Sequence, residues 1–467
     1  MRVLLMNHFP LQGSGSGVYT VNIARALVRK GHEVCIIMPE NEVLAELDVD
    51  GIRLHPVYFD SCSADALDFD FPCFTTHPRS VMTFYELDDA QVAAYEGAFR
   101  AAIEDEIAAF DPDVIHCGHI WLQASYAADY GIPLIITAHG TDLIGFQKSE
   151  RFREQARKAF DTADAIITIS KDSTALVNKL FGEPEKVHLV RNGYDPTVFY
   201  PDESSVAEVL THFDIDGDYD DIVSFAGKFA HFKGIDILLN AAALYERDGV
   251  ATIIAEDGEL FGEMTALAKE LGLRHVHFVH NQPHDVLRHL YSCATVSLLT
   301  SRNEPFGLVA IEALACGAPV IASDEGGPLD IITPEVGLLF QSENPEAWRA
   351  RYSSCSMATS TSTARRSLAM PSRTTRKMSR LASSSLFTRQ LSDKPRQRGA
   401  GISLSHLAHR EAIERRCKGA RRKDREAGCR EATVEARWLP CAHPKVIPAC
   451  AWRVCRGQAR RRGSPRR

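Results

Sequence analysis

The strongest constraint on the fold is the stretch VSLLTSRNEPFGLVAIEALACGAPVIASDEGGPLD at residues 296–330. Its pattern predicts a strand at Val296–Leu299, a helix from about Leu308 to Ala315, and a second strand at Val320–Ala322. Two apolar runs separated by a helical segment of this length are typical of a βαβ unit in a parallel sheet. Because such sheets bind ligands at the carboxyl ends of their strands, we expect a binding site in the loops that follow these two strands.

Two glutamates accompany this loop and helix. Glu304 lies in the loop, and Glu312 follows eight positions later inside the helix. We expect both carboxylates to face one cleft near the start of the helix. The ordinary alternative is that Glu304 caps the helix and that Glu312 is a solvated surface charge, since glutamate is usually exposed.

Backbone groups at the same edge are suited to an anion. The helix start, at Phe306, Gly307 and Leu308, offers N–H groups without helical partners and the positive end of the helix dipole. Gly326 and Gly327 form a turn after the second strand. These five residues are therefore candidates for binding a charged group of the ligand.

Two lysines stand five positions apart in a region that contains few lysines. Lys228 follows the predicted strand Ile222–Ala226, and Lys233 precedes a predicted helix. Taken singly, each lysine would more often be a solvated surface residue. As a pair in this position they suit a diphosphate, because each ammonium group can neutralise negative charge on a leaving nucleotide.

The first residues of the chain predict a Rossmann-like opening. A strand at Val3–Met6 is followed by a glycine-rich turn, a helix from Tyr19 to Lys30 and a strand at Val34–Met38. Gly15 and Gly17 of the turn would let backbone N–H groups approach a phosphate closely. A mobile surface turn would have the same composition, so this motif is weak evidence when taken alone.

A histidine ends another predicted strand of this half. His139 follows the strand Leu134–Thr137, at the edge of the sheet where ligands bind. A structural loop histidine is an equally good interpretation from the residues alone. Asp142 could hydrogen-bond the imidazole or an acceptor hydroxyl. Residues 57–88 are irregular and rich in aromatic residues, and they predict a long loop over an acceptor site.

Residues 304–327 resemble the Glu-x7-Glu donor-sugar motif of family 4 glycosyltransferases, because Glu-Pro-Phe-Gly-Leu, Glu-Ala-Leu-Ala and Gly-Ala-Pro-Val-Ile-Ala follow in that order. The resemblance covers about residues 1–345. It implies an α/β fold of two Rossmann-like domains that face a cleft, the GT-B arrangement. The expected domains are an acceptor-side domain at 1–192 and an incomplete nucleotide-sugar donor domain at 193–348.

The resemblance also implies a reaction: a sugar passes from a nucleotide donor to an acceptor hydroxyl, with retention at the anomeric carbon. Glu304 would contact hydroxyls of the sugar, and Glu312 would hold the ribose of the nucleotide. Lys228 and Lys233 would neutralise the diphosphate, and His139 would lie near the donor sugar. The family usually has Arg where this chain has Lys228, which keeps the charge but loses the bidentate fork.

The expected partners are a nucleotide-sugar donor and a glycan, lipid or small-molecule acceptor, with no nucleic acid and with peripheral membrane contact as an option. We expect no cofactor and no metal, because acidic pairs such as Asp68/Asp70 and Asp111/Asp113 stand isolated in loops. The 12 cysteines form no Cys-x-x-Cys and predict reduced thiols in the cytoplasm. Two alternatives remain, a sugar-nucleotide epimerase of similar fold and an inactive protein.

Charge is distributed very unevenly along the chain. Of the 53 Lys and Arg and the 61 Asp and Glu, about 29 and about 7 lie after residue 350. The net charge is therefore about −30 before that point and about +22 after it. A body so acidic and so poor in lysine predicts a halophilic protein, because salt screens the repulsion among its carboxylates. An acidic mesophilic protein is the alternative.

The pattern of alternating strands and helices ends at about Trp348, and residues 349–467 are basic and lack a helical or strand period. Family 4 enzymes should continue here with amphipathic helices that complete the second domain. Read in a shifted frame, the segment from Ser356 to Ala364 can encode an acidic loop like those of the body. We therefore predict a disordered tail produced by a frameshift near 348. A natural nucleic-acid-binding tail is the alternative.

Overall fold

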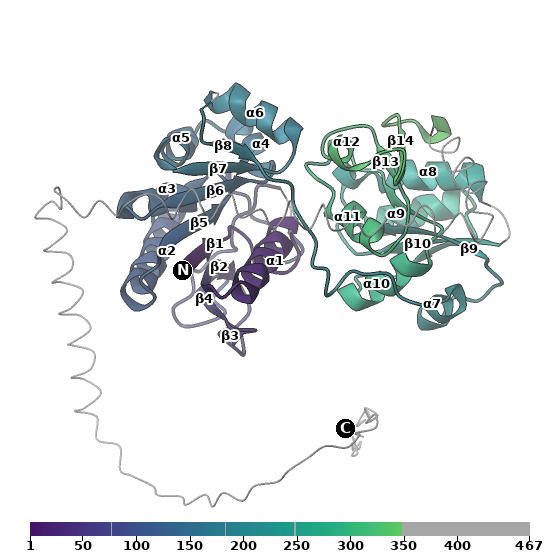
Figure 1. Cartoon of the computed structure of the whole chain (residues 1–467), viewed down its shortest axis with the longest axis horizontal. Coiled ribbons are helices and arrows are strands. Elements are labelled where there is room, and N and C mark those ends of the chain that lie inside the picture. Colours follow the sequence, from purple (N-terminus) through teal and green to yellow (C-terminus); the bar gives the residue numbers. More distant parts are fainter. Residues whose placement is uncertain (76, 183, 247–248, 348–467) are drawn as a thin grey trace, which may run out of the picture. The chain divides into compact units, whose positions relative to one another are not determined.

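The computed structural model describes residues 1–347 apart from residues 76, 183 and 247–248, and this part of the chain contains two β-sheets flanked by helices (Figure 1). Each sheet alternates strands and helices along the sequence, which is the α/β class predicted above. The predictions of disorder and of a frameshift concern residues 349–467, which lie outside the described residues. The proposed domain boundary at residue 192 also stays a prediction.

The first sheet has eight strands in the order β3-β4-β2-β1-β5-β6-β7-β8. All neighbours pair in parallel except β3 and β4. The strands are β1 Arg2–Met6, β2 Glu33–Glu40, β3 Asp48–Val49, β4 Ile52–Tyr58, β5 Val114–Gly118, β6 Leu134–Ala138, β7 Ala165–Thr168 and β8 Val187–Leu189. The central strands are buried almost throughout, as expected for parallel strands covered on both faces.

Three helices of the first sheet, α1, α2 and α6, begin at side-chain caps. The helices of this sheet are α1 Gly15–Arg29, α2 Asp89–Ala109, α3 Leu122–Ala127, the 3₁₀ turn η1 Ala128–Tyr130, α4 Thr141–Lys148, α5 Arg153–Thr162 and α6 Lys171–Phe181. The side chain of Ser14 accepts from the N–H of Gly17 at the start of α1. Asp88 and Ser170 form capping boxes at α2 and α6, which fixes where these helices begin.

The second sheet has six strands, all parallel, in the order β11-β10-β9-β12-β13-β14. They are β9 Asp221–Ala226, β10 Val250–Ala255, β11 Val276–Phe278, β12 Val296–Leu299, β13 Val320–Ser323 and β14 Gly337–Phe340. The helices are α7 Val206–His212, the 3₁₀ turn η2 His231–Lys233, α8 Ile235–Tyr245, α9 Phe261–Glu270, α10 His284–Cys293, α11 Leu308–Ala315 and α12 Pro328–Ile331.

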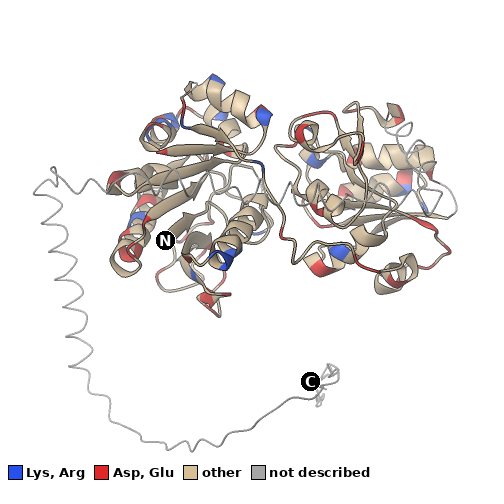
Figure 2. Cartoon of the chain, in the orientation of Figure 1, with Lys and Arg blue, Asp and Glu red and all other residues tan. Residues whose placement is uncertain are grey.

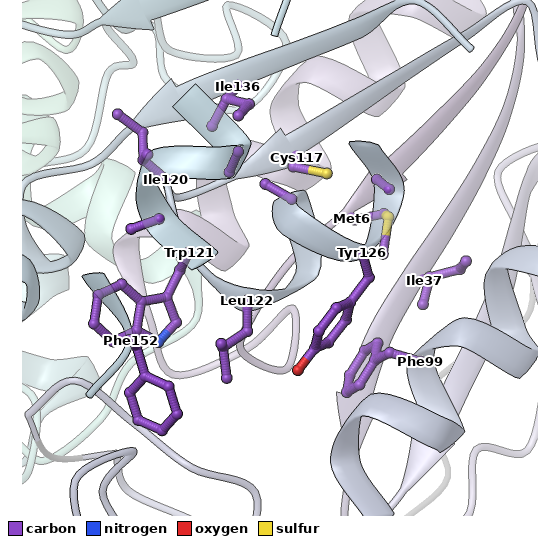
Figure 3. Close-up of a cluster of buried hydrophobic side chains, with 14 of the residues drawn as sticks. Met6, Ile37, Phe99, Cys117, Ile120, Trp121, Leu122, Tyr126, Ile136 and Phe152 are labelled. Carbon is purple, nitrogen blue, oxygen red and sulfur yellow. The ribbon is translucent and has the colours of Figure 1, made fainter. Parts of the chain in front are cut away.

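Buried apolar side chains hold each sheet between its helices. In the second sheet, Ile222 and Ala226 of β9 pack in one cluster, whereas Val223 and Phe225 pack in another. This alternation shows that both faces of the strand are buried. In the first sheet, Trp121 packs against Phe152 with ring centroids 5.6 Å apart (Figure 3).

The segment between β4 and α2 packs into the core of the first sheet more than the sequence predicted. Its described residues form only isolated bridges, such as Cys73 with Thr83, so the expected irregularity is present. Its aromatic side chains, however, are buried in the core of the first sheet; they include Phe59, Phe69, Phe71, Phe74 and Phe84. Their apolar surface is therefore used in folding, and the interpretation of the segment as a loop over an acceptor site stays a prediction.

Lys, Arg, Asp and Glu all occur on the helices and loops of the described chain, and the acidic residues are spread along it (Figure 2). Within residues 1–347, with the gaps given above, no helix is both long and apolar enough to cross a membrane.

Candidate functional site

The carboxyl ends of β9 and β12 bring two predicted site residues together. These strands are neighbours in the sheet. Lys233 ends the η2 turn after β9, and Glu304 lies in the loop after β12. The Lys233 Nζ donates a hydrogen bond to Glu304 Oε2 across 2.7 Å. Their side chains are 20% and 9% exposed, so this is a largely buried ion pair.

The environment of Glu304 keeps its carboxylate charged. Burial alone would raise the pKa of this carboxyl, but the charge and hydrogen bond of Lys233, with a hydrogen bond from the N–H of Phe306, hold the pKa below its usual value. The alternative that Glu304 caps α11 is wrong, because the N-cap is Gly307 and no side chain caps the helix.

Glu312 lies inside α11 and is 5% exposed, so it is not a solvated surface charge. Burial raises the pKa of its carboxyl to about 7, and the negative charge of Glu256 acts in the same direction. Both predicted glutamates are thus buried at one edge of the second sheet. Their pKa values are shifted in opposite directions, because Lys233 lowers that of Glu304, whereas burial and an acidic neighbour raise that of Glu312.

At the start of α11, the main chain could contact an anion, whereas the side chains are used in the apolar core. Phe306 is buried with its side chain in the apolar core, and Leu308 packs against the same core. Gly307 has φ +99, a conformation that favours glycine. The N–H of Phe306 already bonds the Glu304 carboxylate. Anion binding by the main-chain N–H groups at the helix start stays a prediction.

The glycine pair after β13 packs directly on the Glu304 loop. The N–H of Gly327 donates to Glu304 O at 2.7 Å. A Cβ at Gly326, which has φ +68, would lie 2.3 Å from Glu304 O, and a Cβ at Gly327 would lie 2.3 Å from the Phe306 Cα. Glycine is thus required for loop packing at both positions, and diphosphate binding by this pair stays a prediction.

Lys228 lies two residues beyond β9 and is partly buried. Burial lowers the pKa of its ammonium group, while nearby acidic groups act in the opposite direction. The structure therefore places both predicted lysines at the carboxyl edge of the second sheet. Lys233 has the carboxylate partner described above.

One residue of this edge was missed in the sequence. Glu256 follows β10 and has φ +106, which is unusual for a residue with a side chain. Its N–H donates to His280 O at 2.7 Å, and its charge raises the pKa of Glu312. The only available signal was an acid at the carboxyl end of a strand, because a positive φ cannot be read from glutamate. Strain of this kind concentrates at functional sites.

At the edge of the first sheet, His139 belongs to a buried aromatic cluster. Its ring lies 4.8 Å from the ring of Tyr19 and 4.9 Å from that of His119, measured between centroids. The rings of His119 and His8 are 5.3 Å apart. Burial lowers the pKa of His8 and of His139 to about 3, so both are neutral at pH 7. Within the described residues, His139 Nε2 is buried without a hydrogen-bond partner.

One expectation for this edge needs correction. Asp142 does not bond the imidazole, because its carboxylate accepts from the N–H of Ile120 at 2.8 Å and of Gly140 at 2.9 Å. Gly17 lies inside α1, where a Cβ would be 2.6 Å from the carbonyl oxygens of both Pro10 and Leu11. Glycine is thus required there for packing against its own chain, and phosphate binding by Gly17 stays a prediction. Gly15 is the first residue of α1, and its phosphate role stays a prediction.

The predicted site residues thus form two sets on two sheets. Gly15, Gly17 and His139 belong to the first sheet, whereas all the others belong to the second. In the described part of the chain, no group of three or more His, Cys, Asp or Glu side chains is arranged to hold a metal ion.

Two family descriptions match successive parts of the sequence. The family described as Glycosyltransferase Family 4 matches residues 13–198, and the one described as Glycosyl transferases group 1 matches residues 215–355. An uncharacterized glycosyltransferase of Methanocaldococcus jannaschii is 30% identical over 356 residues, which is 72% of this chain and 83% of that protein. A D-inositol 3-phosphate glycosyltransferase of Catenulispora acidiphila is 32% identical over 293 residues, 57% of this chain and 68% of its own.

Solved structures share the fold. A sucrose-phosphate synthase of Thermosynechococcus elongatus has a TM-score of 0.65 at 22% identity, covering 84% of this chain and 99% of that one. The Anabaena protein HepE, solved in complex with UDP and glucose, has a TM-score of 0.62 at 17% identity, with the same coverage. The two parallel sheets, the buried Glu304 and Glu312 of one βαβ unit and the sequence matches agree, and this chain therefore belongs to the family 4 glycosyltransferases.

Proposed function

We propose that the protein transfers a sugar from a nucleotide-sugar donor to an acceptor hydroxyl with retention of the anomeric configuration. The observation that carries the proposal is the buried pair of Lys233 and Glu304, because it joins a cation suited to a phosphate with a carboxylate suited to sugar hydroxyls. The structural neighbour HepE was solved with UDP-glucose, which supports a donor of this class.

In the proposed reaction, the bond between the anomeric carbon and the diphosphate oxygen breaks, and a bond from the acceptor oxygen forms on the same face of the sugar. The acceptor proton passes to the leaving phosphate oxygen, so the products are a glycoside and a nucleoside diphosphate. Lys233, Lys228 and the N–H groups at the start of α11 stabilise the charge that develops on the leaving group. This stabilisation grows as the bond breaks, which is what accelerates the reaction.

The two glutamates have separate proposed roles. Glu304, charged and held by Lys233, accepts hydrogen bonds from hydroxyls of the sugar. Glu312 accepts from the ribose hydroxyls of the nucleotide, and its carboxyl can also donate while protonated, since burial raises its pKa to about 7. Residues of the first sheet, with His139 among them, are proposed to face the sugar and the acceptor.

The test is a screen of nucleotide sugars with measurement of the released nucleoside diphosphate, followed by NMR of the product's anomeric proton. A glycoside of retained configuration is expected. An inverted product would contradict retention, and an epimerised sugar without any acceptor-linked product would favour a sugar-nucleotide epimerase. We also propose a cytoplasmic enzyme without metal or cofactor; loss of activity after EDTA treatment, restored by a divalent cation, would contradict the metal part.

A further inference from the structure

Arg302 lies in the loop after β12, two residues before Glu304, and its guanidinium group uses all five of its N–H donors. Nη1 donates to His231 O at 2.7 Å and to Asp236 Oδ1 at 2.9 Å. Nη2 donates to Asp236 Oδ2 at 2.7 Å and to Glu343 Oε2 at 3.0 Å. Nε donates to the other oxygen of Glu343. The side chain is only 18% exposed.

Two of the residues that Arg302 bonds flank Lys233 in the sequence. His231 and Asp236 lie on either side of Lys233, in the η2 turn and at the start of α8. The arginine therefore holds both ends of the short segment that carries the lysine, while its own backbone leads within two residues to Glu304.

Main-chain contacts reinforce this connection. The N–H of Arg302 donates to Phe232 O at 2.7 Å, and the hydroxyl of Thr300 donates to Lys233 O at 3.0 Å. A Cβ at Gly234, which has φ +65, would lie 2.1 Å from Thr300 O. The backbones of the lysine segment and the glutamate loop are thus in direct contact, so a shift of one displaces the other.

We propose that Arg302 is a positioning residue of the donor site: it fixes the Lys233 ammonium against the Glu304 carboxylate through Asp236 and the carbonyl of His231. This inference rests on the proposed function, since the lysine and the glutamate are assigned their roles there. Protein acceptors use all five N–H donors of Arg302, so it acts through Lys233 and not on the substrate.

The geometry explains why this position needs arginine. A planar guanidinium group can donate to both oxygens of Asp236 and to a carbonyl at the same time, whereas the three N–H donors of a lysine are all on one nitrogen atom. Burial would raise the pKa of Asp236, yet the hydrogen bonds and charge of Arg302 hold that pKa below its usual value. The bond to Glu343, a residue 57% exposed beyond β14, adds a weaker third attachment.

The test compares Arg302→Lys and Asp236→Asn with a matched control, Arg288→Lys, in the full chain. Arg288 lies in α10, is 16% exposed and bonds Asp202, so it is as buried as Arg302 but has other partners. We expect Arg302→Lys to lower kcat about 10- to 100-fold, the usual effect of displacing a reacting group. Asp236→Asn should have a smaller effect in the same direction, and the control should stay within about twofold.

A double-mutant cycle separates positioning from general stability. If Arg302 acts through Lys233, adding Arg302→Lys to Lys233→Met should cause no further loss of kcat. Independent, multiplying losses would overturn the proposal, as would an Arg302→Lys enzyme as active as the control. A uniform loss of stability would lower the activity of both backgrounds equally, so it cannot imitate the expected result.

A second measurement does not require turnover. Hydrogen exchange can be followed by mass spectrometry in a peptide covering residues 229–238. This peptide should exchange faster in Arg302→Lys than in wild type, and its exchange rate in Arg288→Lys should equal that of wild type. Equal exchange in all three proteins would overturn the positioning role. If wild type neither binds UDP nor turns over any nucleotide sugar, the proposed function fails, while the exchange result still decides whether Arg302 orders this segment.

Discussion

Lys233 and Glu304 stand 71 positions apart in the sequence, and their side chains meet across 2.7 Å at the edge of the second sheet. Both side chains are mostly withdrawn from water, so each charge is stabilised chiefly by the other. The ion pair thereby fixes the orientation of the ammonium and carboxylate groups before any ligand binds. A diphosphate that approaches Lys233 would share this cation with the glutamate.

Replacing Lys233 by Met should destabilise the protein by about 3–5 kcal/mol, because it leaves the buried Glu304 carboxylate without its partner. The replacement should also weaken binding of UDP. Urea denaturation and calorimetry measure the two effects. Lys158→Met is the control, since Lys158 and Asp129 are 43% and 40% exposed and such a pair contributes about 0–1 kcal/mol. Equal stability losses in the two variants would show that the buried pair is not special.

Above pH 7, where its carboxyl with a pKa of about 7 is ionised, replacing Glu312 by Ala should weaken nucleotide binding by roughly 1.5–3 kcal/mol, the contribution of a hydrogen bond to a charged group. Glu304→Ala should reduce turnover more than nucleotide affinity, because its proposed partner is the sugar. Calorimetry with UDP on both variants distinguishes these outcomes. Unchanged UDP affinity in Glu312→Ala would show that its assignment to the ribose is wrong.

The buried histidines should make stability depend on pH. Burial lowers the pKa of His8 to about 3, whereas the same side chain titrates near 6.5 in an unfolded chain. Below about pH 6.5 the unfolded state binds a proton that the folded state excludes, so the stability contributed by a neutral His8 is present above this pH and is lost as the pH falls toward about 3. His116 and His139, with pKa values of about 4 and about 3, act in the same direction.

Acids with raised pKa values oppose this trend, so the sharpest test is a difference between two proteins. Asp142, with a pKa of about 6, and Glu312, with a pKa of about 7, lose their stabilising effect as the pH rises. The free energy of unfolding of His8→Gln should fall less steeply than that of wild type between pH 6.5 and 4, by about 1.4 kcal/mol per pH unit. Parallel curves would mean that His8 carries a proton in the fold.

The acidic body should become more stable in molar KCl. About 54 carboxylates precede residue 350, and salt screens their mutual repulsion. Thermal unfolding in low and in molar KCl provides the measurement. Sucrose is the control, because it stabilises by exclusion from the surface without screening charge. A melting temperature that stays flat or drops on adding KCl would contradict the halophilic interpretation.

The frameshift interpretation concerns residues 349–467, and DNA sequencing across codon 348 tests it directly. Restoring the reading frame at this codon should recover activity, because family 4 enzymes are expected to complete the second domain with helices. We also predict that the basic segment does not pack as a folded unit, since it has few large apolar residues at regular spacing. A trypsin-resistant fragment beyond residue 360 would contradict both statements.

The sequence was sufficient for the βαβ unit around Glu304. Its strand at Val296–Leu299 and its helix at Leu308–Ala315 have the predicted bounds, because local apolar period and burial agree there. The parallel α/β architecture followed from the regular alternation of such units. Elements without a clear period were missed, and β4, α4, α7 and α12 are the examples. β4 contains Pro56 yet pairs with β2 over its whole length, so sheet pairing overrode the local signal.

Contacts between distant residues were beyond prediction. The sequence placed Lys233 and Glu304 at one edge, but it could not indicate their hydrogen bond, nor the five bonds of Arg302. The expected bond of Asp142 to the imidazole was wrong, because backbone N–H groups use its carboxylate, and one of them, that of Ile120, comes from another loop. The conformation of Glu256 could not be inferred either, since glutamate rarely adopts a positive φ.

The close approach of Gly326 and Gly327 to the Glu304 loop has an evolutionary consequence. Because main-chain atoms make these contacts, the curvature of this edge does not depend on the identity of neighbouring side chains. Substitutions around this edge can therefore accumulate without moving its main chain, whereas a side chain at either glycine would collide with backbone atoms. Along a lineage of such chains, these two positions should stay glycine while the residues around them vary.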